Sequence, residues 1–306
     1  MCYNYYSNEL PSSIGNLVHL RFLSVKDSVI RRFSSCVANL MCMQTLDLHA
    51  KVRMTVSNMF KNMKQLRHLY LPWNHRVSGE KLSLATLCNL QTLVNLYSED
   101  SDLNDVELSN LTKLYIVAPK GSKHLEKLDE MLKSRSITFN HLRSLYLLED
   151  HSGGDIIVLR FPFISKLRLF GLTRLPEELL RYPNLVKIKL YNTYLEEDQI
   201  EVLEKLPELR VLHLEFGCLK ELKEWTMEEG AMPRLCRLNI DHCQGLRALP
   251  DGLQYSTTLK ELVLKQMPIE LCSRLDEEGE DFYKIKHVPS VIITERQFIW
   301  ELNHGM

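Results

Sequence analysis

The sequence predicts an α/β solenoid in which short parallel strands stack one behind the next, and three observations predict it. The pattern L-x-x-L-x-L recurs eleven times along the 306 residues. Successive copies begin 21 to 31 residues apart. Within each copy the apolar residues alternate with other residues, which is the period of a strand that buries one face. Since one such strand cannot cover its apolar face alone, the copies must stack.

The spacing of the copies is that of leucine-rich repeats, whose units are 20 to 29 residues long. Only one interval, of 31 residues, is longer than this range, and one copy, LQTLVN, lacks the last apolar residue. Stacked strands predict a horseshoe with a parallel concave sheet and an irregular or helical convex side. The copies begin at Leu20, Met43, Leu66, Leu90, Leu111, Leu142, Ile164, Leu185, Leu209, Leu235 and Leu259.

The segments between the strands must return across the convex side. ELPSSIGNL from Glu9, RLPEELLRYPNL from Arg174 and ALPDGLQYSTTL from Ala248 share a Leu-Pro step, where proline fixes φ after the strand ends. DQIEVLEKL predicts a helix with Asp198 as its N-cap. HLEKLDEMLK, residues 124–133, predicts a second helix within the 31-residue interval. The first helix should bury Ile200, Leu203 and Leu206 on one face.

The repeats predict one domain over residues 1–269 and a C-terminal capping segment over residues 270–306. The stretch EDFYKIKHVPSVII follows the last repeat and is long enough to lay apolar side chains over the open end of the stack. At the other end, we expect the first repeat to leave Leu20, Leu23 and Val25 exposed. The apolar residues of the expected cap are Phe282, Tyr283, Ile285, Val288, Val291 and Ile292.

Composition predicts a cytoplasmic protein without a nucleic-acid partner. The 38 basic and 39 acidic residues give a formal net charge of −1, so no global field attracts nucleic acid or anionic membranes. The longest apolar runs, such as IIVL at 156–159, are too short to span a bilayer, and MCYNYYSNEL does not resemble a signal peptide. Eight scattered cysteines without a C-x-x-C pair indicate reduced thiols.

The sequence offers weak candidates for a metal or catalytic site. His242 and Cys243 are adjacent, but Cys243 occupies the Asn/Cys position of the repeat itself, and a zinc site needs four ligands at recognisable spacing. His68 and His213 have no nucleophile or carboxylate partner that the sequence places beside them. The acidic runs at 98–107 and 276–281 lack the order of a calcium loop. We therefore expect no enzyme activity, no metal and no cofactor.

The concave strand positions predict a protein-binding surface. Basic and aromatic residues share the middle strands, and Tyr and Arg are enriched at the energetic centres of interfaces. A local basic cluster on a nearly neutral chain indicates an acidic partner surface, although exposed strand faces also tolerate such residues without any partner. The predicted binding residues are Lys113, Tyr115, Tyr146, Lys166, Arg168, Phe170, Lys187, Lys189 and Tyr191.

Several stretches carry a family resemblance. LPSSIGNLVHLRFL, LEKLPELRVLHL, LKELVLKQMP, the EEGAMP stretch at 228–233 and EDFYKIKHVPSV from Glu280 are the most telling. With them, nearly the whole chain resembles the repeat region of plant coiled-coil nucleotide-binding leucine-rich-repeat (CNL) disease resistance proteins, of the downy-mildew and late-blight resistance type.

The resemblance implies a sensor module of plant innate immunity. In a full-length receptor the repeats would hold a nucleotide-binding switch in its ADP-bound state and release it when a pathogen effector or a modified host protein binds. The sequence has no G-x-x-x-x-G-K-[ST] phosphate-binding loop, so we expect the sensor half alone. The alternative is the substrate-recognition half of a ubiquitin-ligase adaptor of the F-box type.

Overall fold

A computed structural model describes residues 8–97, 101–102, 109–118, 139–149, 163–171, 175, 177–193, 197–215 and 225–294. The chain divides into two compact units, residues 1–143 and residues 144–306. Each unit consists of stacked repeats around its own apolar core.

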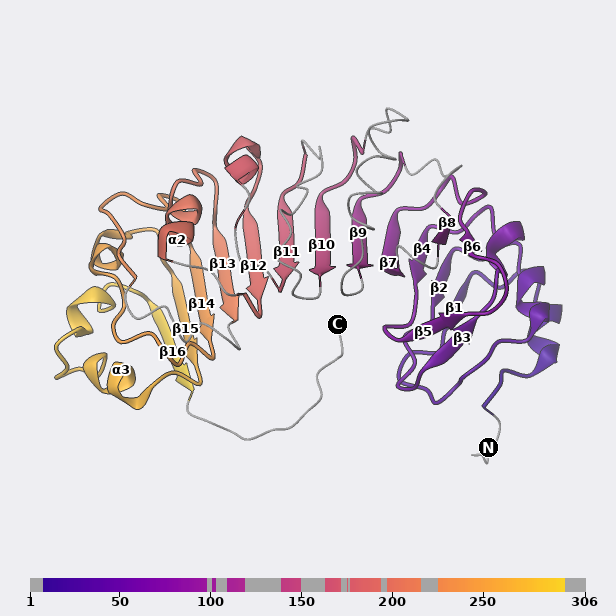
Figure 1. The fold of residues 1–306 in the computed structure, drawn as a ribbon, viewed down its shortest axis with the longest axis horizontal. Coiled ribbons are helices and arrows are strands. Elements are labelled where there is room, and N and C mark those ends of the chain that lie inside the picture. The colour runs from indigo at the N-terminus through magenta and orange to yellow at the C-terminus, as the bar shows by residue number, and fades with distance from the viewer. Residues whose placement is uncertain are drawn as a thin grey trace. The chain divides into compact units, whose positions relative to one another are not determined.

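The first unit is a parallel sheet of repeat strands with their returns. Its main sheet contains β1 (Phe22–Ser24), β2 (Thr45–Asp47), β4 (His68–Tyr70), β7 (Thr92–Tyr97) and β9 (Lys113–Ala118), in that order (Figure 1). Two small parallel ladders pair β3 (Met54–Val56) with β5 (His75–Val77), and β6 (Leu82–Ser83) with β8 (Ser101–Asp102). The returns hold the 3-10 helices η1 (Ser12–Asn16), η2 (Ser35–Asn39) and η3 (Phe60–Asn62).

The described residues of the second unit form seven parallel strands that follow the chain in order. They are β10 (Ser144–Glu149), β11 (Lys166–Phe170), β12 (Lys187–Tyr191), β13 (Val211–Glu215), β14 (Arg237–Asp241), β15 (Glu261–Lys265) and β16 (Ser290–Thr294) (Figure 1). Its helices are η4 (Glu177–Arg181), α2 (Glu197–Glu204), η5 (Asp251–Tyr255), α3 (Ile269–Arg274) and η6 (Phe282–Lys284).

One-to-one register joins the leucines of neighbouring strands into continuous rows. In the second unit the sequence-equivalent residues of β11 to β15 pair directly, and the apolar residues that face the core are 0–3% exposed. Each buried leucine contributes about 1.5–3 kcal/mol relative to an exposed one. The parallel solenoid predicted from the repeats is therefore confirmed. One such row consists of Leu167, Ile188, Leu212, Leu238 and Leu262.

The returns agree with most of the sequence predictions. Each of the three Leu-Pro steps leads into a 3-10 helix, and Pro11 and Pro250 precede η1 and η5 with φ of −56° and −65°. Helix α2 buries Ile200, Leu203 and Leu206 as expected. The expected N-cap role of Asp198 is wrong, because α2 already begins at Glu197. Acidic residues are also favourable within the first turn, so they do not define the boundary. The helix predicted at 124–133 lies outside the described residues.

The first repeat is less open than the sequence suggested. Val25 is only 5% exposed, because its backbone N–H donates to the carbonyl oxygen of Asp47 at 2.9 Å and holds it against the second repeat. Leu20 and Leu23 are partly buried. The expectation that all three are exposed is therefore wrong for Val25. Exposed apolar side chains at this end belong to Leu17, Val18 and Phe22.

The copy that seemed incomplete, LQTLVN, forms a full strand with a β-bulge. Leu93 pairs with Leu114, and the next pair is Leu96 with Ile116, so two residues of β7 face the single Tyr115 of β9. The second bulge residue, Asn95, has a φ of 60°, and its Nδ2 donates to the carbonyl oxygen of Leu71 at 2.9 Å. The bulge returns Leu96 to the buried face, where the repeat requires an apolar residue.

We predict that Asn95→Ala and Asn95→Gly both destabilise the protein, and that alanine costs more. Both changes leave the buried carbonyl oxygen of Leu71 without its side-chain donor, at about 1–3 kcal/mol. Alanine adds about 1 kcal/mol because its Cβ is unfavourable at positive φ, where glycine is not. Urea unfolding of the three proteins measures both terms. Equal losses for the two variants would contradict the role of the backbone conformation.

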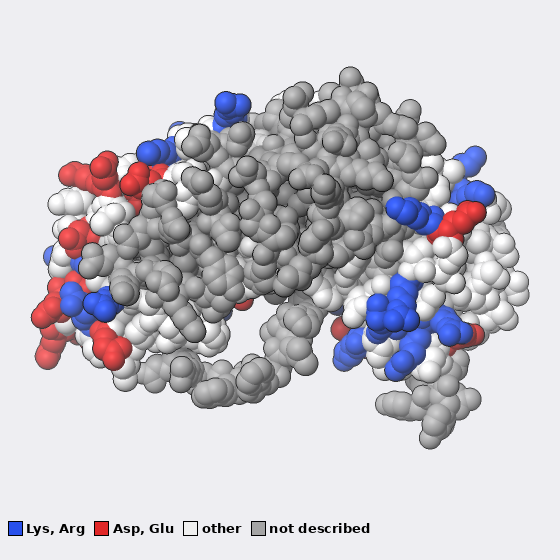
Figure 2. All heavy atoms as spheres, viewed as in Figure 1, with Lys and Arg blue, Asp and Glu red and all other residues white. Residues whose placement is uncertain are grey.

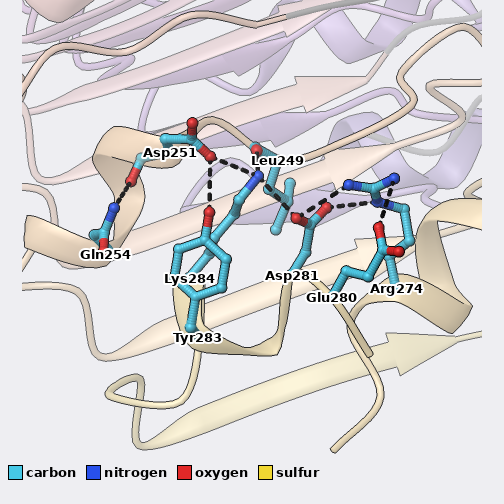
Figure 3. A network of polar contacts seen from close by, with 8 residues as sticks. All are labelled: Leu249, Asp251, Gln254, Arg274, Glu280, Asp281, Tyr283 and Lys284. Carbon is cyan, nitrogen blue, oxygen red and sulfur yellow. Dashed lines mark hydrogen bonds and ion pairs between the residues drawn. The ribbon is translucent and has the colours of Figure 1, made fainter. Parts of the chain in front are cut away.

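The C-terminal segment is attached to the repeats by a network of charged side chains, of which Asp281 and Lys284 are buried (Figure 3). The Lys284 ammonium is buried and donates to the carbonyl oxygen of Leu249 at 2.8 Å, and it pairs with Asp251 at 2.8 Å and with Asp281 at 3.0 Å. Arg274 Nε donates to the buried Asp281 carboxylate at 2.7 Å. The network therefore ties α3 and η6 to the return that contains η5.

The same network shifts the pKa values of its members. Burial alone would raise the pKa of Asp281, but hydrogen bonds from Arg274 and Lys284 outweigh it and hold this pKa below its ordinary value of 3.8. Burial alone would lower the pKa of Lys284, and its bonds to Asp251 and Asp281 raise it instead. Both ions are thus stabilised in the folded state.

The predicted boundary between the repeat domain and the capping segment, at residue 270, stays a prediction. Helix α3 begins one residue before it.

We predict that Asp281→Ala lowers the free energy of unfolding by about 3 kcal/mol, since it removes one partner of a buried ion pair. The depressed pKa of Asp281 means that its contribution is present above the unfolded value near 3.8 and is lost as pH falls through the lower folded value. The difference between the two proteins should therefore shrink in acid. Glu280→Ala is the control, because Glu280 is exposed and should change stability by less than about 0.5 kcal/mol. An equal effect of both changes would contradict the network's role.

Candidate protein-binding site

Six of the predicted binding residues lie together on β11 and β12 in the second unit. Strand alternation sends Leu167 and Leu169 into the core and leaves the residues between them on the opposite, outward face. Register then sets like residues side by side, about 5 Å apart. The pairs are Lys166 with Lys187, Arg168 with Lys189, and Phe170 with Tyr191. We call these six residues the basic cluster.

The basic cluster places like charges at short range. Burial lowers the pKa of Lys187, and the nearby charges of Arg168, Lys166 and Arg237 lower it further. The pKa of Lys189 is lowered by burial and then by Arg168 and Lys187. Like charges on directly opposite strand positions are destabilising. The charged forms of Lys187 and Lys189 are therefore less favourable here than they would be in water.

Aromatic rings border these cations. The Lys189 ammonium lies 5.8 Å from the centroid of the Tyr191 ring, and that ring lies 5.5 Å from the ring of His213 on β13. Tyr146 on β10 pairs with Arg168 in register and so joins the cluster. Amphipathic rings beside guanidinium and ammonium groups are the composition of an interface centre.

The outward face changes sign on the next two strands. Tyr191 is followed in register by Glu215 on β13 and Asp241 on β14. Burial raises the pKa of Asp241, and the neighbouring charge of Glu215 raises it further. His213 Nε2 lies 3.4 Å from a carboxylate oxygen of Glu215, so the expectation that no carboxylate lies beside His213 is wrong: residues two apart on a strand share a face. Glu215 and Asp241 therefore border the basic cluster on its β13 side.

Lys113 and Tyr115 lie on β9 in the first unit, and the other seven predicted binding residues lie in the second unit. The Lys113 ammonium is 4.7 Å from the centroid of the Tyr115 ring. Tyr115 is only 6% exposed, although the sequence placed it on the accessible face. Strand alternation gives the direction of a side chain but not its depth, and Tyr115 lies opposite the bulge of β7. It offers little surface to a partner.

Sequence reasoning missed a polar cluster on the first unit. His49 Nδ1 lies 3.0 Å from the Asp47 carboxylate, His49 Nε2 lies 3.3 Å from the side-chain amide of Asn95, and the ring of Tyr70 lies 5.5 Å from that of His49. Burial would raise the pKa of Asp47, but hydrogen bonds from His49 outweigh it and lower this pKa. The Asp-x-His spacing on outward positions was the signal available.

A set of exposed cations on the β3–β5 ladder was also missed. Arg32 and Thr55 form a bridge, and Thr55 pairs with Arg76. Exposed Arg31 and Arg53 flank the same ladder, and Figure 2 shows basic side chains gathered over this part of the first unit. Arg32, Thr55 and Arg76 occupy one register position of successive repeats, so aligning the repeats could have placed Arg32 and Arg76 on the same ladder.

Comparison with known proteins decides the family. The family model described as "Leucine-rich repeat region" matches residues 2–249. The chain belongs to this leucine-rich-repeat family.

The repeats are similar to plant disease resistance proteins. Probable disease resistance RPP8-like protein 2 of Arabidopsis thaliana is 35% identical over 315 residues, which is 92% of this chain and 34% of the relative. Disease resistance protein RPP8 of the same plant is 34% identical over 313 residues, with the same coverage. The chain thus spans about a third of the length of the curated relatives that it matches.

Solved structures share the repeat fold. An internalin (inlF) from Listeria monocytogenes has a TM-score of 0.51 and 16% identity, with 92% of this chain and 78% of that chain covered. A TDR receptor also has a TM-score of 0.51, with 17% identity and coverage of 94% and 58%. At these identities the likeness is one of fold alone.

Cys243 and His242 of the leucine-rich repeats lie at the exit of β14. The Cys243 thiol is fully buried, and burial raises its pKa to about 12, so it stays protonated and unreactive. His242 has a φ of 58° and pairs with the Asp241 carboxylate at 3.3 Å. Within the described residues, no three His, Cys, Asp or Glu side chains gather as metal ligands would.

The described helices include none that is long and apolar enough to cross a membrane.

We predict that Lys189→Gln leaves the leucine-rich repeats as stable as before or raises their free energy of unfolding by up to about 1 kcal/mol, because it removes like-charge repulsion. The gain should shrink when salt is added. Lys205→Gln is the control: its ammonium pairs with Glu201 at 3.6 Å, so its loss should cost no more than about 0.5 kcal/mol. Urea unfolding at two salt concentrations checks both. A loss above about 1 kcal/mol for Lys189→Gln would show that Lys189 stabilises the fold.

Proposed function

We propose that these leucine-rich repeats are the sensor module of an intracellular plant immune receptor. In this function they bind an acidic protein surface through the basic cluster of β11 and β12. The partner is the nucleotide-binding switch domain of a receptor, a pathogen effector or a guarded host protein. Binding to the switch restrains it, and binding of the effector or modified host protein releases it.

The basic cluster is the single observation that carries the proposal. Its four cations stand in register on neighbouring strands, and two of them have lowered pKa values because of burial and mutual repulsion. Like charges directly opposite one another on neighbouring strands repel, so an acidic partner surface would favour this arrangement. Charge complementarity with an acidic partner would offset this repulsion and would also speed association.

Similarity to plant disease resistance proteins supports the same proposal. The relatives are about three times longer than this chain. In the proposed receptor, the switch domain that these repeats restrain lies outside the 306 residues, either in another segment or in another chain. Release requires that the effector or modified host protein bind the released state more tightly than the closed state by a few kcal/mol. Both partners would then compete for one outward face.

We assign the repeats a binding role rather than catalysis, and we place the protein in the cytoplasm. The six described cysteines are free thiols, as suits a reducing compartment, and the buried Cys243 is a packing residue. The alternative of a ubiquitin-ligase adaptor receives less support, because the curated relatives above are disease resistance proteins.

The test is the double variant Arg168→Glu/Lys189→Glu. It should weaken co-precipitation with the nucleotide-binding domain of an RPP8-like receptor by at least about tenfold, since two charge contacts become repulsive. The fold should persist, because both side chains lie opposite the leucine core. Circular dichroism checks the fold, and titration of the domain measures the affinity.

Arg181→Glu/Lys286→Glu is the matched control, because it makes the same change in net charge at exposed residues away from the outward face of the sheet. It should leave the affinity within about twofold. Unchanged binding by the Arg168/Lys189 variant would place the functional surface elsewhere, first on Arg237, Asn239 and Asp241 of β14. Equal losses in both variants would show that only net charge matters.

A further inference from the structure

Strand β16 is an edge with unused hydrogen-bonding groups. The backbone N–H of Ser290 donates to Lys260 at 3.1 Å, and the carbonyl oxygen of Thr294 accepts from Gln266 at 3.1 Å. Since backbone groups alternate sides along a strand, Ser290, Ile292 and Thr294 face β15. The N–H and C=O groups of Val291 and Ile293 therefore point away from the sheet, and no described strand pairs with them.

This edge is apolar and lacks the usual protection. Val291 is 36% exposed although it pairs with the fully buried Leu262, and Ile292 is 46% exposed beside Val263. Sheet edges are normally shielded by charges, bulges or prolines within the strand. The sequence Ser-Val-Ile-Ile-Thr has none of these, and the preceding Pro289 lies outside it.

The strand is also nearly symmetric about Ile292. Read in either direction it presents a hydroxyl residue, a β-branched aliphatic residue, Ile292, a second aliphatic residue and a second hydroxyl residue. An antiparallel copy centred on Ile292 would pair Ser290 with Thr294 and Val291 with Ile293. β-branched residues opposite one another are favourable cross-strand pairs.

We propose that β16 pairs antiparallel with β16 of a second copy of this chain, with Ile292 on the two-fold axis. In this register Val291 and Ile293 of the two copies form hydrogen-bonded pairs, so that all four outward N–H groups find carbonyl partners. The two Ile292 residues form the closer, non-hydrogen-bonded pair, with Cα atoms about 4.5 Å apart.

Other registers use the edge less well. Centring the pair on Val291 would place Ile293 opposite Pro289, which has no N–H to donate. Centring it on Ile293 would place the N–H and C=O of Val291 opposite residue 295 of the second copy, which lies beyond β16. Only the register about Ile292 uses every outward group of Ser290–Thr294 in both copies. It also continues the row of Leu262 and Val291 into the second copy and covers the exposed apolar side chains.

A second copy suits this edge better than an unrelated strand. The interface is isologous, so one sequence must complement itself, and the near-symmetry of Ser290–Thr294 meets this condition. The strand carries no charge that would repel its own copy. The pairing closes after two chains and therefore predicts a dimer rather than a filament.

The oligomeric state of the chain tests the proposal. Sedimentation velocity from about 1 to 100 µM should show a concentration-dependent shift from monomer to dimer, within the affinity range of modest interfaces. Ile293→Pro removes an outward N–H and keeps every bond to β15, because proline is tolerated on an edge strand whose N–H faces solvent. It should raise the dimer dissociation constant at least tenfold. Ile293→Val, which keeps the N–H and the branched side chain, should dimerise like the original chain.

Cysteine cross-linking tests the register. Ile292→Cys should form a disulfide between two copies under mild oxidation, because the paired Cα atoms fall within disulfide range. Ile293→Cys is the matched control. In this register residue 293 lies opposite Val291 of the second copy, so the Cα atoms of the two residues 293 are diagonal to each other and too far apart for a disulfide. Both variants share the native cysteines, so only their difference is informative.

Ile292→Lys alters an exposed side chain without touching the backbone, and it should abolish the dimer by placing two like charges together.

A chain that stays monomeric at 100 µM would overturn the proposal. So would a dimer that survives both Ile293→Pro and Ile292→Lys with unchanged circular dichroism, since the interface would then lie elsewhere. Growth beyond two chains, or equal cross-linking of the two cysteine variants, would replace the two-fold pairing with a head-to-tail or non-specific contact. None of these outcomes bears on the basic cluster.

Discussion

In-register stacking of parallel strands is the constraint on which the rest of this molecule depends. Each repeat strand of the main sheets is only three to six residues long and has one apolar face, so neither its hydrogen bonds nor its leucines are satisfied without neighbours. The continuous rows through Leu167, Ile188, Leu212 and Leu238 show how each repeat completes the next. The same register fixes which side chains stand side by side on the outward face.

Strand alternation separates the core-facing residues from the outward-facing ones. The core face is occupied by leucines whose identity the repeat dictates, and the outward face is free to vary because it carries little of the packing energy. That freedom explains how Arg168 can stand beside Lys189 on β11 and β12 at an acceptable cost, while Glu215 stands beside Asp241 on β13 and β14. A surface of this kind can change its partner by substitution without endangering the fold.

The C-terminal end of the second unit combines two opposite solutions to the problem of ending a stack. Lys284, Asp281 and Arg274 bury charge in a network with several hydrogen bonds each, which fixes the segment before β16 firmly in place. The strand that follows pairs with β15 along its full length but leaves Val291 and Ile292 accessible. The firm attachment of the segment gives the open edge a defined position, which any pairing partner requires.

The sequence by itself determined the repeat, its period, the parallel sheet and the buried leucines, because these follow from a local pattern of period two repeated at a fixed interval. It also placed Lys166, Arg168, Lys187 and Lys189 on one face, since alternation and register need no further information. Only the tertiary structure decided the features that depend on contacts between repeats. The bulge at Asn95 needs a carbonyl oxygen from the preceding repeat, the burial of Tyr115 depends on its depth opposite that bulge, and the charge network joins residues more than 30 positions apart. β16 carries no repeat pattern at all, and it became a strand because β15 offered it an unpaired edge.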